Sequence, residues 1–198
     1  ASKPFDNPNS WDVFDVYGDN NGLRGYQGAL YHNKYVYFVP YFIESLERCL
    51  VQQYLGTLEK CVPGSKILRY NTEAGFHDSS AWEWVGYFDA YEDGVVEKNF
   101  VYFAPHLDRK NNVYAIPLRY DTTKEFSSPT GWERFDTKIH GSYIGAASDG
   151  EKIYYGPYLQ KNESGVTITD KSTLLIYDTN KLFDDRNSWE YRSISYGI

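Results

Sequence analysis

Short runs of alternating apolar and polar residues follow four tryptophans of this chain. They read WDVFDV from Trp11, WEWVGYF from Trp82, WERFD from Trp132 and WEYRSI from Trp189. Such period-two alternation is typical of a strand with one buried face. A phenylalanine stands six residues before each tryptophan, and most residues between them are Ser, Asp, Asn or Pro, which favour turns. The pattern therefore predicts the same turn and strand four times.

Two further pieces recur in a fixed order. Segments 25–42, 90–107 and 142–159 each place one tyrosine fourteen residues before a proline and another three residues before it. A third strand-like piece follows as KILRYNT (66–72), IPLRYDT (116–122) and LLIYDTN (174–180), and its tyrosine lies six residues before the phenylalanine of the next turn. One unit therefore contains four predicted strands.

The successive tryptophans are 71, 50 and 57 residues apart. Four strands per repeat at this period predict a β-propeller, in which each sheet buries its faces against neighbouring sheets. We therefore expect one all-β domain over residues 1–198. A β-sandwich is the alternative, although sandwiches do not require such constant internal spacings.

The repeats are too few for an ordinary closed ring. The chain holds three complete units and one extra N-terminal strand, whereas propellers usually close with four to eight blades. We expect a homodimer that completes the ring, because two-fold symmetry is the commonest arrangement of soluble oligomers. A four-bladed monomer that uses the N-terminal strand for closure is the alternative.

The first unit is lengthened by residues 43–64. Leu46, Leu50, Tyr54 and Leu58 recur at helical spacing, so we expect a helical insertion. Cys49 and Cys61 flank part of it, and either a disulfide or two reduced thiols would fit. The insertion could be a subunit contact, a lid, or a cluster covering one sheet.

Composition narrows the classes of function. Of the 198 residues, 18% are aromatic, including 20 Tyr, and tyrosine favours strands. The net charge of −7 argues against binding a nucleic-acid backbone. No apolar run is long enough to span a membrane.

Several features favour a secreted protein. The chain begins at Ala1 and contains no Met, as expected after removal of a leader, although removal of an initiator Met from a cytoplasmic protein gives the same start. Asn162 begins an N-glycosylation sequence, and the cysteine pair suits an oxidising compartment.

The sequence contains few signs of catalysis. Its four histidines have no metal-binding spacing, and no phosphate loop or nucleophile motif is present. Whether a metal lies on the axis stays open. Glu92 and Asp93 stand out, because the corresponding pairs are Gln27-Gly28 and Ile144-Gly145. With His106 they could serve a glycosidase or lyase, or they could be a solvated pair that protects a sheet edge.

Repeated aromatic positions suggest a binding site. The first-strand residues Tyr26, Tyr91 and Tyr143, and the post-proline residues Tyr41, His106 and Tyr158, would lie near the mouth of a propeller, with Glu92 among them. Such rings suit sugars or flat aromatic ligands. The alternative is that the tyrosines are core residues between sheets. We expect Arg69 and Arg119 to be structural, with each fork on the Asn or Asp that follows its tyrosine.

The tyrosine-to-proline pieces, the RYDT pieces and the phenylalanine-to-tryptophan turns resemble Tyr/Trp-rich β-propellers of the kelch and tachylectin type. The resemblance covers the chain outside 43–64, but the paired glycines of kelch repeats are absent. In its size, its lack of Met and its excess of aromatic residues, the chain also resembles the pigment-binding pink chromoproteins of oyster mushrooms. That likeness implies a non-enzymatic protein that holds an organic chromophore. A sugar-binding lectin with one site per blade is the alternative, although Gln27, Glu92 and Ile144 differ at the repeated position.

Overall fold

The protein is all-β. The computed structural model describes residues 4–16, 23–41, 66–86, 89–107, 114–160 and 171–195. These residues form three four-stranded antiparallel sheets, and their helical structure consists of short 3₁₀ turns. The predicted strands and turns are therefore confirmed, apart from the N-terminal strand.

Each sheet is built from four strands that are consecutive in the chain. The first sheet contains β1 (Tyr26–His32), β2 (Tyr35–Pro40), β3 (Ile67–Asn71) and β4 (Trp82–Val85). The second contains β5 (Ala90–Glu97), β6 (Phe100–Leu107), β7 (Leu118–Asp121) and β8 (Trp132–Arg134). The third contains β9 (Gly141–Ser148), β10 (Lys152–Gln160), β11 (Lys171–Asp178) and β12 (Trp189–Ser195).

The turn before each fourth strand has the same construction. Each contains a three-residue 3₁₀ turn: η2 (Ser79–Ala81), η3 (Pro129–Gly131) and η4 (Arg186–Ser188). The indole nitrogen of Trp82 donates to the Phe76 carbonyl at 3.0 Å, and the corresponding bonds in the other two sheets measure 2.9 Å. The constant six-residue spacing follows from this bond, since it fixes the indole against the start of the turn.

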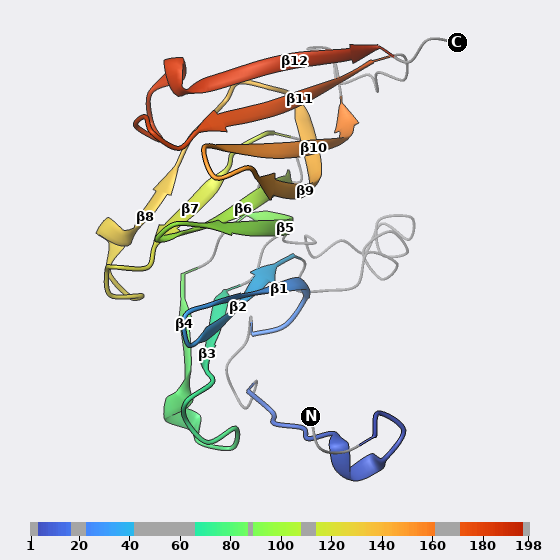
Figure 1. Ribbon diagram of the computed structural model, residues 1–198, viewed down its shortest axis with the longest axis vertical. Helices are drawn as coiled ribbons and strands as arrows, with labels where there is room; N and C mark the ends of the chain where they lie inside the picture. The colour runs from blue at the N-terminus through green and yellow to red at the C-terminus, as the bar shows by residue number, and fades with distance from the viewer. Residues whose placement is uncertain are drawn as a thin grey trace, which may run out of the picture.

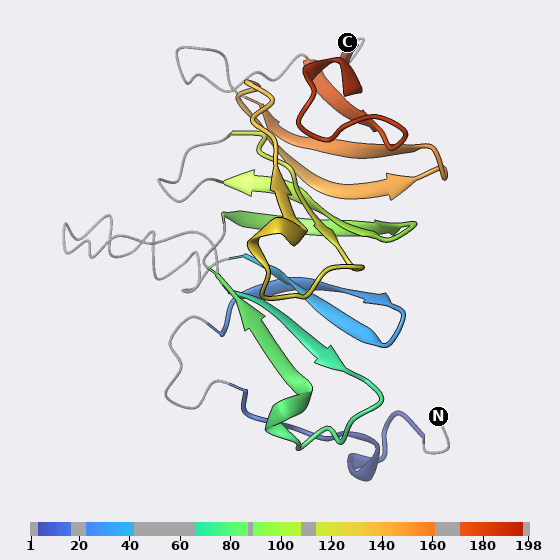
Figure 2. The same ribbon diagram turned by 90° about the vertical axis from the view of Figure 1, so that its left-hand side faces the viewer.

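The three sheets are arranged one after another in chain order (Figures 1 and 2). One hydrophobic cluster joins the first sheet to the second and contains Tyr37, Val39, Phe103, Tyr120 and Phe126. A second cluster joins the second sheet to the third. The described residues do not close into a ring, because segment 4–16 and β12 lie at opposite ends of the stack.

An arginine faces the following sheet at each junction. The Arg69 guanidinium lies 4.3 Å from the Phe126 ring centre, and that of Arg119 lies 4.6 Å from Phe183. We expected their forks on the following Asn71 and Asp121, which is wrong. They bind Glu83 and Glu133 instead, which lie directly opposite them on the neighbouring strands. Asn71 and Asp121 lie two positions after the arginines and share their face of the sheet, but each lies further along its strand, towards the turn. The glutamates directly opposite are the nearer partners.

The predicted N-terminal strand is also wrong. Residues 11–16 form no strand, because the described chain places no strand beside them to supply the backbone partners that a sheet requires. The turn before them does form, as η1 (Pro8–Ser10), and the Trp11 indole donates to the Phe5 carbonyl at 2.8 Å. Phe14 stacks on Trp82 with ring centres 5.6 Å apart. The segment therefore covers part of the outer face of the first sheet.

Three expectations lie outside the described residues. These are the helical insertion at 43–64, the pairing of Cys49 with Cys61, and glycosylation at Asn162. No helix in the described ranges has both the length and the apolar character needed to cross a membrane.

Candidate functional site

The first strand of every sheet is bulged at the same place. The pairing of β1 with β2 shifts between Tyr26 and Gly28, which leaves Gln27 as an extra residue. The pairing of β9 with β10 shifts likewise around Ile144. In β5 the shift spans Glu92 and Asp93. A bulge redirects side chains that regular pairing would fix, and both acids of β5 lie within this one.

Asp93 occupies space that its counterparts leave empty. The equivalent residues in the other first strands are Gly28 and Gly145. A Cβ on Gly28 would lie 3.7 Å from one Asp93 carboxylate oxygen, and a Cβ on Gly145 would lie 3.8 Å from the other. The strands β1, β5 and β9 therefore converge around this carboxylate, which is the only side chain that the three equivalent positions contribute.

The three post-proline residues meet near this point. Tyr41, His106 and Tyr158 each follow the proline of a second strand, and the sheets bring them into one group. The ring centres of Tyr41 and His106 are 5.3 Å apart, and those of His106 and Tyr158 are 6.1 Å apart. His106 is buried, whereas 58% of the Tyr158 surface is exposed. The group therefore offers an open aromatic face beside a buried polar interior.

Glu92 contacts two members of this group, His106 and Tyr41. Its carboxylate oxygen is 3.5 Å from His106 Nδ1, and both side chains are about nine-tenths buried. Burial raises the pKa of Glu92; a hydrogen bond donated by the Tyr41 hydroxyl opposes this rise, and the neighbouring charge of Asp93 adds to it. This environment differs from the solvated pair that the sequence left open for Glu92.

His106 is neutral at pH 7. Burial lowers its pKa to about 4, so its contact with Glu92 is not an ion pair at neutral pH. Its Nε2 atom lies 3.4 Å from the Tyr41 hydroxyl, which itself donates to Glu92. The arrangement provides a short polar chain from an imidazole through a phenol to a carboxyl group.

The predicted first-strand tyrosines lie elsewhere. Tyr91 and Tyr143 are fully buried in the clusters between sheets. Tyr26 is half-buried, and its hydroxyl donates to the Lys66 carbonyl at 3.0 Å. Tyr91 and Tyr143 match the alternative that the sequence left open, namely core residues between sheets, whereas Tyr26 belongs to neither cluster. We leave all three out of the candidate site.

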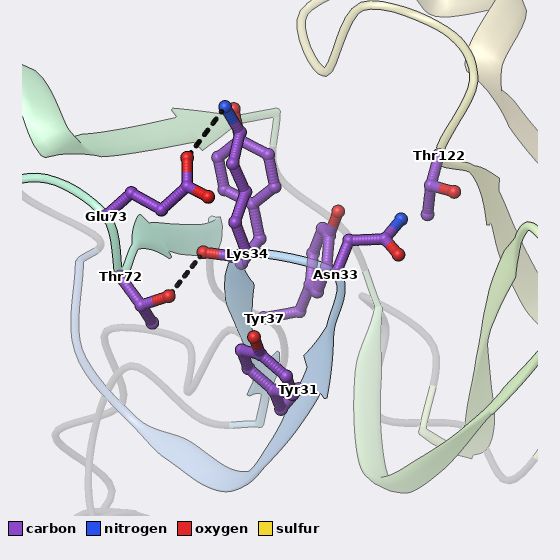
Figure 3. A pocket seen from close by; sticks show the side chains of 8 residues that line it. Tyr31, Asn33, Lys34, Tyr37, Thr72, Glu73 and Thr122 are labelled. Atoms are coloured by element: carbon purple, nitrogen blue, oxygen red, sulfur yellow. Dashed lines mark hydrogen bonds and ion pairs between the residues drawn. The ribbon is translucent and has the colours of Figure 1, made fainter.

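A hollow that the sequence did not predict lies between the first and second sheets. Its volume is about 330 Å³, and it opens beside the β1–β2 hairpin, as Figure 3 shows. Its lining comprises Tyr31, Asn33, Lys34, Tyr35, Tyr37, Thr72, Glu73 and Thr122. This hollow contains none of the residues of the first site.

No group of three or more His, Cys, Asp or Glu side chains that could hold a metal ion occurs among the residues that the structure describes.

Neither a scan against protein-family models nor a search of curated protein sequences finds a match for this chain.

Proposed function

We propose that the protein is a non-enzymatic binding protein that holds a small, flat aromatic ligand against Tyr158, above His106 and Tyr41. The observation that carries this proposal is the convergence of one ring from each sheet, of which only the Tyr158 ring is largely exposed. Exposed aromatic faces with a few polar groups suit planar ligands. An uncharged chromophore needs no counter-charge from His106, which is neutral at pH 7.

A direct test uses the intact protein and isatin, an uncharged planar heterocycle, as the probe. We expect saturable binding, with affinity at least tenfold lower in Tyr158→Ala. Tyr31→Ala is the matched control, because Tyr31 is similarly exposed but lines the other hollow. Equal affinity in the Tyr158 variant would reject the site. A visible absorption band in the purified native protein would identify a resident pigment.

The second candidate is an enzyme, and one observation favours it. The carboxyl group of Glu92 has a raised pKa and touches a neutral imidazole, as in many acid–base pairs. A glycosidase or lyase would require Glu92, and Glu92→Gln would abolish its turnover while the aromatic ligand still bound. The lectin alternative with one site per blade gains less, because the bulged residues differ in all three sheets.

We also propose that the three sheets are blades of a β-propeller whose ring is completed by a second copy of the chain. At both junctions a turn phenylalanine packs beside a tyrosine of the preceding sheet, with ring centres 6.2 and 6.3 Å apart. On the third sheet, Tyr154 and Ile176 stand where such a contact would form next. A native mass of twice 23.0 kDa would support the proposal, and a mass of one chain would reject it.

A further inference from the structure

The hollow between the first and second sheets is lined by turn residues of both sheets together with tyrosines of the first. Asn33 and Lys34 form the turn of the β1–β2 hairpin, whereas Thr122 follows β7 of the next sheet. In Figure 3, Asn33 lies between Thr122 and the rings of the first sheet. A volume of about 330 Å³ lies at the lower end of the range for small-molecule sites.

The repeat explains why this hollow is open. Lys98 occupies in the β5–β6 hairpin the position that Asn33 occupies in the β1–β2 hairpin, and both adopt left-handed backbone conformations, with φ of 53° and 54°. At the next junction the Lys98 ammonium donates to Thr179 at 3.1 Å. Thr179 corresponds to Thr122. The longer lysine therefore spans the space that the shorter asparagine leaves free.

The polar groups around the hollow are electrically balanced. The Lys34 ammonium lies 3.4 Å from a Glu73 carboxylate oxygen, so neither side chain offers an uncompensated charge to a ligand. The Thr72 hydroxyl donates to the Lys34 carbonyl at 2.9 Å and retains its lone pairs as acceptors. A charged ligand would have to separate the ion pair, whereas hydroxyl groups can donate to Glu73 and accept from Lys34 without doing so.

The hollow also has an apolar wall. Tyr31 is 64% exposed, and Tyr35 and Tyr37 complete the aromatic lining. Tyrosine rings provide an apolar surface with a polar edge, which matches a ring-shaped ligand that is apolar on its faces and hydroxylated at its rim. We propose that this hollow is a binding site for one neutral pyranose sugar, with Tyr31 as the stacking surface and Asn33, Glu73 and Thr122 as hydrogen-bonding partners.

The substitution Asn33→Lys tests the proposal, since it reproduces the residue that closes the equivalent space. Calorimetric titration with glucose, galactose and N-acetylglucosamine should show saturable binding of at least one sugar to the intact protein. We expect Asn33→Lys to weaken that binding at least tenfold without loss of folding, because Lys98 already adopts this backbone conformation. Tyr31→Ala should weaken it similarly. Lys98→Asn is the matched control and should bind normally.

The test of sugar binding in this hollow can be distinguished from the test of isatin binding at Tyr158. Tyr158→Ala should leave sugar binding unchanged, and Asn33→Lys should leave isatin binding unchanged. The proposal is overturned if none of the three sugars binds the native protein, or if Asn33→Lys binds as well as the native protein does. Preferential binding of glucuronate or glucosamine would overturn the assignment of a neutral ligand.

Discussion

The Arg119 guanidinium crosses from the second sheet to the third, where it donates to the Tyr177 hydroxyl at 2.9 Å. Another nitrogen of the same group lies 2.9 Å from a Glu133 carboxylate oxygen of its own sheet. The same group lies 4.3 Å from the Phe100 ring centre, so one cation is bonded along its edge and packed on its flat face. This relationship is one of the contacts that join the second sheet to the third, beside the hydrophobic cluster between them.

Replacement of Arg119 by Met should therefore destabilise the protein. We expect a loss of about 2–3 kcal/mol in the free energy of unfolding, because the substitution leaves polar partners unsatisfied at a buried junction. Urea denaturation of the native protein and of Arg119→Met measures this loss. Arg192→Met is the control, since that arginine is 69% exposed and pairs with a neighbouring glutamate; it should cost less than about 1 kcal/mol. Equal losses would show that Arg119 does not join the sheets.

A second prediction concerns Gly94, which ends the bulge in β5. A Cβ at Gly94 would lie 2.3 Å from the Tyr102 carbonyl oxygen and 2.7 Å from a Leu30 methyl group, so Gly94→Ala must displace backbone. We expect a loss of a few kcal/mol in thermal or urea unfolding. Gly28→Ala should be tolerated, because its nearest neighbours are 3.7 Å away or more. If both variants unfolded alike, the convergence of β1 and β5 would be incorrectly described.

A third prediction concerns the N-terminal segment, residues 4–16. Phe14 stacks on Trp82, whereas Phe5 is 81% exposed. Phe14→Ala should lower the free energy of unfolding by about 1–2 kcal/mol and change tryptophan fluorescence, because it uncovers a partly buried indole. Phe5→Ala should change stability by less than about 0.5 kcal/mol. If Phe14→Ala left the free energy of unfolding unchanged, segment 4–16 would not pack on the first sheet.

The sequence predicted the sheets well because their determinants are local. The phenylalanine-to-tryptophan spacing is fixed by one indole hydrogen bond, and the tyrosine-to-proline spacing is fixed by one hairpin that contains a bulge. It could not predict the fate of residues 11–16. Their alternation matches that of β4, but a strand forms only when another strand supplies its backbone partners.

The candidate site was found only in part. The shared position of Tyr41, His106 and Tyr158 after proline was sufficient to group them, and their aromatic contacts agree with that grouping. Repetition alone could not separate Tyr158 from Tyr91 and Tyr143, because solvent exposure depends on which sheets cover them. The hollow beside Asn33 was missed, although aligning the hairpins HNKY and EKNF would have shown Asn33 in the place of Lys98.

The burial of His106 makes stability depend on pH. Its pKa falls from about 6.5 in the unfolded chain to about 4 in the folded protein. Between these values the unfolded chain binds a proton that the folded protein does not, so the free energy of unfolding decreases as pH falls. A shift of this size corresponds to an upper bound of roughly 3–4 kcal/mol. We expect urea midpoints to fall between pH 6.5 and 4, and to fall less in His106→Gln.

Glu92 acts in the opposite direction, which allows the two groups to be separated. Its raised pKa means that the folded protein takes up a proton before the unfolded chain does, and this restores some stability as pH falls towards the ordinary carboxyl pKa. Glu92→Gln should therefore show a steeper loss of stability than the native protein between pH 6.5 and 4. His106→Gln combined with Glu92→Gln should remove both contributions. An unchanged slope in both single variants would mean that neither group is buried as described, since titration of the remaining carboxylates is common to all four proteins.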